Sequence, residues 1–366
     1  MPPPGASPVT VGFRCDATPT TGVGHLIRCI AFAEELVARS VAVLFLGDFD
    51  GLPWAQRQLQ LRGMTVCAPE RGPAALAGQC AGLGVDAVVL DGYELDQGCG
   101  EALRREGLTV LALVDGPFGA GQEADLYLDQ NLDAKPLPGL PARATMLAGI
   151  EFALLRDNVR NLRRSVPLPL GSGGGQRVSV LAVFGGTDPR DAALELVPML
   201  LDTGLPQSIR VVAARQNVAQ ALRELPTLPR QELEVIEPVD DLAGLATECD
   251  LVVSAAGSSV WELLCLGVPT AVVCVTANQE VGYRRVVARR IVGPLGCLDA
   301  LRQDPVARAS ACTVLAELLT SPAARAQQAA RGLSLVDGRG RERAADALLC
   351  LVESARGRDA GGRERR

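Results

Sequence analysis

The chain has one histidine, His25, and it follows the short turn Gly22-Val-Gly24. An alternating apolar run at residues 9–15 predicts a strand before this turn, and apolar residues at helical spacing predict a helix after it. We therefore expect His25 in the first helical turn, where backbone amides attract anions and disfavour an extra proton on the ring. There it would serve as a general base near neutral pH. The alternative is a histidine that only caps the turn or packs beside it.

Three aspartates, Asp16, Asp91 and Asp115, each follow directly after an apolar stretch of strand length. Carboxyl ends of parallel strands meet at one edge of a sheet, where ligands bind. The three side chains therefore indicate a site, although any one of them would also serve to cap the next helix. Tyr93 lies two residues after Asp91, and it would hydrogen-bond a substrate or pack under a loop.

Strands and helices alternate along the first half of the chain, which predicts an α/β fold with a doubly wound parallel sheet. The expected strands are residues 9–15, 41–46, 65–68, 87–90 and 109–114, and the expected helices are residues 25–38, 53–62, 73–82 and 97–106.

The same alternation starts again after a segment rich in proline and glycine, at residues 166–177. We expect residues 1–165 to form one lobe, 166–177 a linker, 178–356 a second lobe and 357–366 a disordered tail. Strands are expected at residues 178–184, 209–214, 233–236, 250–254 and 270–275. The two Rossmann-like lobes would face each other across a cleft.

In the second lobe, residues 254–262 read as the end of a strand, a small-residue loop and the start of a helix. Small residues let a diphosphate approach the helix amides, and a carboxylate one turn later would accept both hydroxyls of a ribose. A tight turn with a serine cap is the alternative. The loops that follow neighbouring strands would contribute to the same nucleotide site. The expected nucleotide-binding residues are Gly185, Gly186, Gly257, Ser258, Ser259, Glu262, Asn278 and Gln279.

Composition argues against several classes of protein. A net charge of −6 with 3% aromatic residues does not fit nucleic-acid binding. Eleven cysteines without a C-x-x-C pair, and one histidine, do not fit a zinc site. Lys135 is the only lysine and lies outside any P-loop motif. No apolar run approaches the roughly 20 residues of a membrane span, and no secretory signal is visible, so we expect a cytoplasmic protein without metal or cofactor.

Several motifs occur together in one order. The segments Arg14-Cys-Asp16-Ala-Thr and Gly22-Val-Gly24-His25-Leu-Ile-Arg28-Cys resemble the signature of the UDP-sugar hydrolases of pseudaminic acid biosynthesis (PseG type). Further similar segments are Asp91-Gly-Tyr93, Asp129-Gln-Asn131, Gly149-Ile-Glu-Phe-Ala-Leu-Leu-Arg156, Phe184-Gly-Gly-Thr-Asp188, Ala256-Gly-Ser-Ser-Val-Trp-Glu262 and Asn278-Gln279. This family is related in fold to type B glycosyltransferases.

The resemblance implies an enzyme that hydrolyses UDP-2,4-diacetamido-2,4,6-trideoxy-β-L-altropyranose with inversion and without a metal. His25 would deprotonate water, with Tyr93 at the reacting centre. The sugar would be held by Arg14, Asp16, Gly24, Asp91 and Asn131. The partners would be a UDP-linked amino sugar as substrate and UDP as product.

The sequence departs from the family pattern at three positions. Gly92 replaces a frequent histidine, Gly116 replaces a second aspartate, and Thr18 replaces a serine. These differences bear on the identity of the sugar and leave His25 in place. A UDP-sugar glycosyltransferase and a non-catalytic nucleotide-sugar binding protein are the alternatives.

Overall fold

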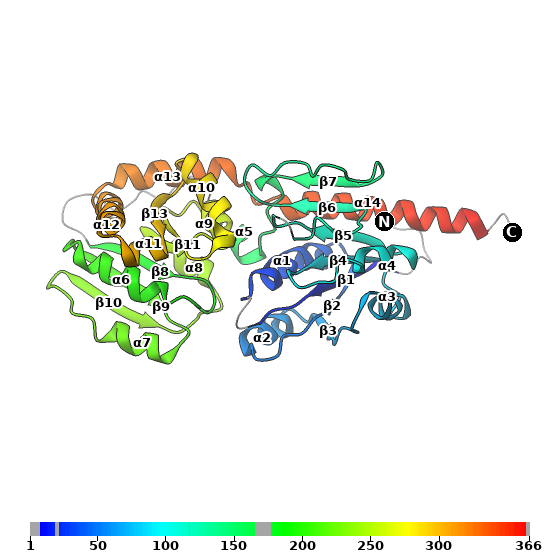
Figure 1. Ribbon diagram of the computed structural model, residues 1–366, viewed down its shortest axis with the longest axis horizontal. Helices are drawn as coiled ribbons and strands as arrows, with labels where there is room; N and C mark the ends of the chain where they lie inside the picture. Colours follow the sequence, from blue (N-terminus) through cyan, green and yellow to red (C-terminus); the bar gives the residue numbers. More distant parts are fainter. Residues whose placement is uncertain (1–7, 19–21, 117, 165–176, 364–366) are drawn as a thin grey trace. The chain divides into compact units, whose positions relative to one another are not determined.

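The computed structural model describes residues 8–18, 22–116, 118–164 and 177–363. The chain divides into two compact units (Figure 1). The first comprises Met1–Arg156 with Arg339–Arg366, and the second comprises Asp157–Gly338. Each unit is built around its own parallel sheet.

The first unit has a sheet of seven strands within its described residues, in the order β3-β2-β1-β4-β5-β6-β7, and every pair is parallel. The strands are β1 (Thr10–Cys15), β2 (Ala42–Leu46), β3 (Thr65–Cys67), β4 (Ala87–Asp91), β5 (Thr109–Leu113), β6 (Leu126–Asp129) and β7 (Thr145–Ala148). The order reverses direction between β1 and β4, and ligands of such sheets bind at this switch point.

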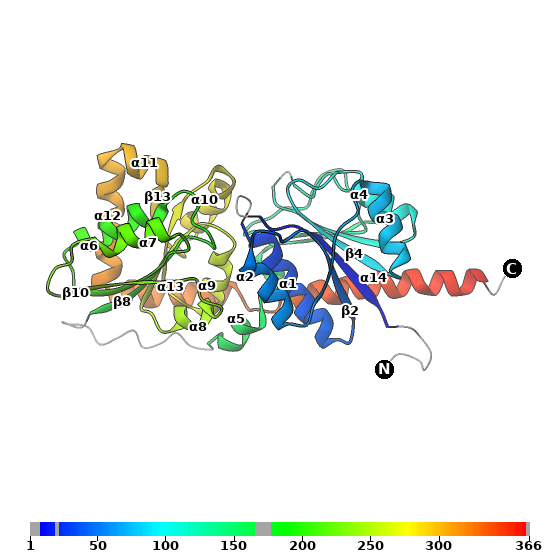
Figure 2. The same ribbon diagram turned by 90° about the horizontal axis from the view of Figure 1, so that it is seen from below.

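Helices cover both faces of the first sheet. They are α1 (Gly24–Ala38), α2 (Pro53–Leu61), α3 (Pro73–Gly82), α4 (Cys99–Arg105), the short η1 (Ile150–Phe152) and α14 (Gly340–Arg363). Residues of β1 that face α1 and α14 include Phe13, whose ring stacks on Phe45 and meets Phe32 edge-on. The opposite face packs against α3 and α4 (Figure 2). Burial on both faces explains why β4 is apolar from Ala87 to Leu90.

The last helix corrects the predicted lobe boundaries. Residues 339–356 were expected in the second lobe, but α14 packs against α1 and buries Ala344, Ala345, Leu348 and Val352 in the core of the first unit. Conversely, α5 (Asp157–Leu162) lies in the second unit. The expected tail at 357–366 is helical as far as Arg363. The proposed linker lies almost wholly outside the described residues.

The second unit repeats the same sheet order, β10-β9-β8-β11-β12-β13, again with parallel pairs. Its strands are β8 (Val178–Val183), β9 (Gln207–Val212), β10 (Gln231–Ile236), β11 (Leu251–Ala255), β12 (Thr270–Cys274) and β13 (Gly293–Cys297). Its helices, besides α5, are α6 (Ala192–Asp202), α7 (Gln216–Arg223), α8 (Leu242–Thr247), α9 (Ser259–Leu266), η2 (Ala277–Gln279), α10 (Glu280–Ala288), α11 (Leu298–Gln303), α12 (Pro305–Thr320) and α13 (Pro322–Leu335). Its switch point lies between β8 and β11.

These two Rossmann-like units confirm the predicted α/β fold with parallel sheets, and the ten predicted strands are present with ends shifted by at most two residues. Three strands were missed: β6, β7 and β13. β6 and β7 have only four residues each, and β13 contains a proline and two glycines, which argue against a strand. The predicted cleft between the lobes stays a prediction.

Candidate functional site

His25 lies in the first turn of α1, as predicted. The turn before it depends on Gly22, whose φ of +78° is favourable only for glycine and whose amide donates to the carbonyl oxygen of Thr18 at 2.8 Å. Gly24 is the first residue of α1, and Val23, which precedes it, offers no side-chain cap to the helix amides. His25 itself is 7% exposed. Its ring therefore belongs to the protein's interior and reaches the surface only at its edge.

The imidazole of His25 is held by a buried carboxylate. Nδ1 of His25 lies 2.6 Å from Oδ1 of Asp91, the last residue of β4. Arg28, one helical turn after His25, donates its Nε to Oδ2 of Asp91 at 2.6 Å and its Nη2 to Oδ1. The same Nη2 lies 2.9 Å from His25 Nδ1, because both donors converge on one oxygen. Strand β4 is next to β1 in the sheet, so the switch point brings the three side chains together.

The protonation state of Asp91 fixes the tautomer of His25. Burial alone would raise the pKa of Asp91, but the charge of Arg28 and the hydrogen bonds from Arg28 and His25 lower it well below its ordinary value. An ionised carboxylate only accepts hydrogen bonds, so the proton between Asp91 and His25 belongs to Nδ1, as inferred from this network. Nε2 of the neutral ring then carries the lone pair. This is the arrangement of a histidine prepared to take a proton.

Arg28 completes the buried ion pair. Its own burial would lower its pKa, but Asp91 raises it above the ordinary arginine value through charge and hydrogen bonding. No role in the site was predicted for Arg28 from the sequence. Arg28 lies three residues after His25 on a helix, so both side chains are on one helix face. This spacing is the feature of the sequence that indicates a contact between them.

Tyr93 lies against the imidazole of His25. The ring centroids are 4.4 Å apart and the planes meet at 85°, edge to face. The Tyr93 hydroxyl donates to Oδ2 of Asp115 at 2.8 Å, and Asn131 Nδ2 approaches the other oxygen of Asp115 at 3.3 Å. Asn131 also donates both its Nδ2 and its amide to Asp129 at 2.9 Å. Tyr93, Asp115, Asp129 and Asn131 thus form one hydrogen-bonded polar cluster beside the histidine. They follow or end the strands β4, β5 and β6.

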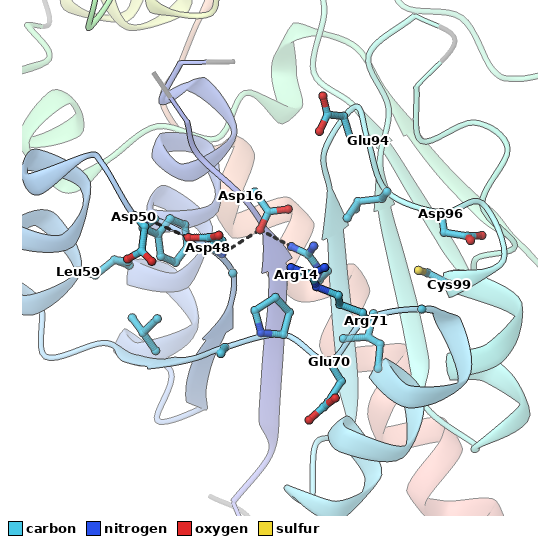
Figure 3. Close-up of a pocket in the computed structure, with 18 of the residues that line it drawn as sticks. Arg14, Asp16, Asp48, Asp50, Leu59, Glu70, Arg71, Glu94, Asp96 and Cys99 are labelled. Carbon is cyan, nitrogen blue, oxygen red and sulfur yellow. Dashed lines mark hydrogen bonds and ion pairs between the residues drawn. The ribbon is translucent and has the colours of Figure 1, made fainter. Parts of the chain in front are cut away.

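Arg14 and Asp16 lie at a separate position on the same sheet edge. They form an ion pair of 2.7 Å, and Asp16 also accepts the amide of Asp48 at 2.9 Å (Figure 3). Both line a pocket of about 1230 Å³ at the carboxyl ends of β1, β2, β3 and β4, with acidic side chains that include Asp50 and Glu94. Neither His25 nor Tyr93 is among the lining residues. Of the predicted sugar-binding residues, Arg14 and Asp16 thus line this pocket, whereas Asn131 belongs to the polar cluster.

One predicted role is wrong. Asp91 was expected to bind the sugar, but its side chain is fully buried and both its oxygens are occupied by Arg28 and His25. It positions the histidine and does not face a ligand.

In the second unit, Gly257 lies where a ligand can approach the backbone. A Cβ at Gly257 would meet, as its nearest neighbour, only Nε2 of Gln279 at 3.6 Å. Ser258 precedes α9 and makes no capping hydrogen bond with its side chain, and Ser259 and Glu262 lie in the first helical turn. The structure thus brings the loops after β11 and β12 together, as predicted from sequence.

The loop after β12 is ordered by its own side chains. Oε1 of Gln279 accepts the amide of Val275 at 2.9 Å, and Oδ1 of Asn278 accepts the hydroxyl of Thr276 at 2.6 Å. These contacts hold the Gln279 amide nitrogen on the side of Gly257.

Gly185 and Gly186 follow β8 and are exposed. The nearby helix α6 has its first amides occupied, because the carboxylate of Asp188 accepts those of Ala192 at 2.8 Å and Ala193 at 3.0 Å. Burial raises the pKa of Asp188, although these amides and Arg215 oppose the shift. At α9 the amides of Val260 and Trp261 donate to the carbonyl oxygens of Gly257 and Ser258 at 3.1 Å, so an anion would approach the amides of Ser258 and Ser259 that precede them.

No group of three or more His, Cys, Asp or Glu side chains in the described part of the chain is arranged to hold a metal ion. Over the same residues, no helix has the length and hydropathy needed to cross a membrane.

Comparison with known proteins agrees with this architecture. No family model matches the chain. The chain is 25% identical over 181 residues to the spore coat polysaccharide biosynthesis protein SpsG of Bacillus subtilis (strain 168), a match that covers 48% of this chain and 51% of the relative. The chain thus spans about half the length of the curated relative that it matches.

Solved structures are similar over nearly the whole chain. MurG of Acinetobacter baumannii has a TM-score of 0.65 at 19% identity, covering 93% of this chain and 99% of that one. The kitacinnamycin glycotransferase has a TM-score of 0.64 at 17% identity, covering 96% and 100%. The chain has the type B glycosyltransferase fold. S. aureus MnaA, solved together with UDP, has a TM-score of 0.60 at 12% identity, covering 92% and 95%.

Proposed function

We propose that this protein is an enzyme of polysaccharide or nonulosonic acid biosynthesis that acts on a UDP-linked sugar and hydrolyses the bond between the anomeric carbon and the diphosphate. The observation that carries the proposal is the contact of 2.6 Å between His25 Nδ1 and the buried, ionised Asp91. It leaves Nε2 as the basic atom at the switch point of the first sheet, where ligands of this fold class bind.

The chemistry then follows from the residues present. Nε2 of His25 takes a proton from water as the oxygen attacks the anomeric carbon from the face opposite the diphosphate, so the anomeric configuration inverts. The bond from this carbon to the diphosphate oxygen breaks, and UDP leaves as an anion. Asp91 stabilises the imidazolium that forms, as a buried carboxylate does in other histidine-dependent hydrolases.

The second unit supplies the groups for UDP. The backbone amides and the hydroxyls of Ser258 and Ser259 would stabilise the negative charge on the diphosphate, and the reaction then needs no metal. Glu262 would bind the ribose. A UDP complex of S. aureus MnaA and the relation to SpsG support a sugar nucleotide as the substrate class. The resemblance to the PseG type supports a diacetamido-trideoxy sugar.

A glycosyltransferase is the second candidate, because solved structures of this fold include transferases such as that of kitacinnamycin. In that case His25 would deprotonate an acceptor hydroxyl in place of water. The residues of the site are the same for both reactions, so only the fate of the sugar separates them.

The test is incubation of purified protein with UDP-2,4-diacetamido-2,4,6-trideoxyhexose or UDP-N-acetylglucosamine in ¹⁸O-labelled water without acceptor. Hydrolysis at the anomeric carbon predicts free reducing sugar and UDP that contains no ¹⁸O. Labelled UDP would indicate attack on phosphorus and contradict the mechanism. UDP release that requires an added acceptor would support the transferase, and UDP binding without turnover would support a non-catalytic binding protein.

A further inference from the structure

Phe118 is an exposed aromatic residue beside the candidate site. Its side chain is 39% exposed, and its ring centroid lies 4.4 Å from that of Tyr93. Tyr93 in turn lies 4.4 Å from the ring of His25. The three rings form a continuous row that leads from the buried histidine to the surface.

The backbone fixes the position of Phe118. Asp115 and Phe118 exchange two backbone hydrogen bonds, of 3.0 and 3.2 Å. Gly119 follows with φ of +76°, and a Cβ there would lie 2.0 Å from the carbonyl oxygen of Leu113. Only glycine fits at this position, so the turn that presents Phe118 depends on it. The turn therefore places Phe118 beside Tyr93, where the two rings are in contact.

The surroundings of Phe118 combine an apolar face with hydrogen-bonding groups. The hydroxyl of Tyr93 donates to Asp115, and Asn131 lies on the other side of that carboxylate. A sugar ring has the matching character, since one face carries C–H groups and the rim carries hydroxyl or amide groups. Sites for such ligands combine an aromatic wall with a few oriented polar groups.

We propose that Phe118 is a specificity-determining residue whose exposed ring packs against the C–H face of the sugar while His25 acts at the anomeric carbon. This inference rests on the proposed function, because it requires a sugar nucleotide at the site. UDP itself would not contact Phe118, so the residue would contribute to affinity for the sugar nucleotide and not to affinity for the nucleotide alone.

The experiment compares binding of UDP and of the UDP-sugar by calorimetry, in a His25→Ala background that prevents turnover. Phe118→Ala should weaken binding of the UDP-sugar about tenfold, the value of a typical aromatic contact, and leave UDP binding within twofold. Phe118→Tyr, which keeps the ring, should restore UDP-sugar binding. Leu194→Ala in α6, at an apolar side chain that is 36% exposed, is the matched control and should change neither affinity.

The same substitutions in the active enzyme give a second readout. Phe118→Ala should raise KM about tenfold with kcat within threefold, while the melting temperature stays close to that of the unaltered protein. The inference is overturned if Phe118→Ala binds the UDP-sugar as tightly as the parent, or if it weakens UDP equally. If the parent protein binds no UDP-sugar, the proposed function fails and the inference fails with it.

Discussion

Nδ1 of His25 and Oδ1 of Asp91 lie 2.6 Å apart although 66 positions separate the two residues in the chain. Strands β1 and β4 are neighbours in the sheet, and Cys15 pairs with Asp91 in their register, so the loop after β1 returns to the end of β4. Through these contacts Asp91 compensates the buried charge of Arg28 and orients the imidazole of His25.

Asp91→Asn should therefore lower both stability and activity. Removing one member of a buried ion pair leaves Arg28 without compensation, and we expect a loss of about 3–5 kcal/mol in the free energy of unfolding at pH 7. The amide NH₂ group can also donate to Nδ1 and so favour the wrong tautomer of His25, and turnover should therefore fall about 10²- to 10⁴-fold. Urea unfolding and a UDP-release assay measure the two effects. Asp125→Asn, at a half-buried carboxylate that pairs with Arg104 at 3.0 Å and has no role in the site, is the control.

The pH dependence of stability follows from the same pair. The pKa of Asp91 is lower in the folded protein than in the unfolded chain, so its ionised form stabilises the fold above about pH 4. This stabilisation is lost as pH falls towards the folded pKa. The difference in unfolding free energy between the parent and Asp91→Asn should be largest near pH 7 and shrink towards pH 3. A difference that is constant over this range would contradict the assignment.

Sequence reasoning identified the sheet edge but not the buried ion pair. The strand-to-helix turn placed His25 correctly, and the apolar strand before Asp91 placed that residue at the same edge. Which face of the helix meets β4 depends on tertiary packing, so the role of Arg28 and the burial of Asp91 were not predictable. The helical spacing of apolar residues such as Ala345, Leu348 and Leu349 does not reveal which sheet a helix covers. Only the structure shows Leu348 in the first core.

Tyr93→Phe tests the hydroxyl that donates to Asp115. Loss of one hydrogen bond of this kind costs about 0.5–1.5 kcal/mol, so turnover should fall by up to about tenfold, while Tyr93→Ala should cost more because His25 also loses the ring contact. Tyr127→Phe is the matched control. Its buried hydroxyl donates to the carbonyl of Gln122 at 2.6 Å, away from the polar cluster, and should affect stability alone. An equal kinetic effect of both substitutions would contradict a role for Tyr93.

Gly257→Ala tests the nucleotide site of the second unit. The added methyl group meets Gln279 at ordinary contact distance, so the protein should fold, but the methyl group should obstruct approach of the diphosphate to the amides of α9. We expect UDP affinity to fall by at least about tenfold in calorimetry. Gly282→Ala in α10, where no atom lies within 4 Å of the new Cβ, is the control and should stabilise its helix by up to about 1 kcal/mol without changing UDP affinity. Unchanged UDP binding in Gly257→Ala would place the nucleotide elsewhere.

Leu348→Ala tests the assignment of α14 to the first unit. Leu348 is fully buried among residues of α1 and β5, and its truncation should lower the free energy of unfolding by about 2–5 kcal/mol. Leu351, on the same helix, is only half-buried, and its replacement by alanine should cost less. Equal and small effects of the two substitutions would show that the helix does not contribute to this core.

The central claim is that His25 acts as the base, and turnover of His25→Ala measures it most directly. With the UDP-sugar in excess and no acceptor, the account predicts a fall in kcat of about 10²- to 10⁴-fold, with UDP affinity within twofold of the parent and an unchanged circular dichroism spectrum. A variant that retains kcat within a few-fold of the parent would contradict the account.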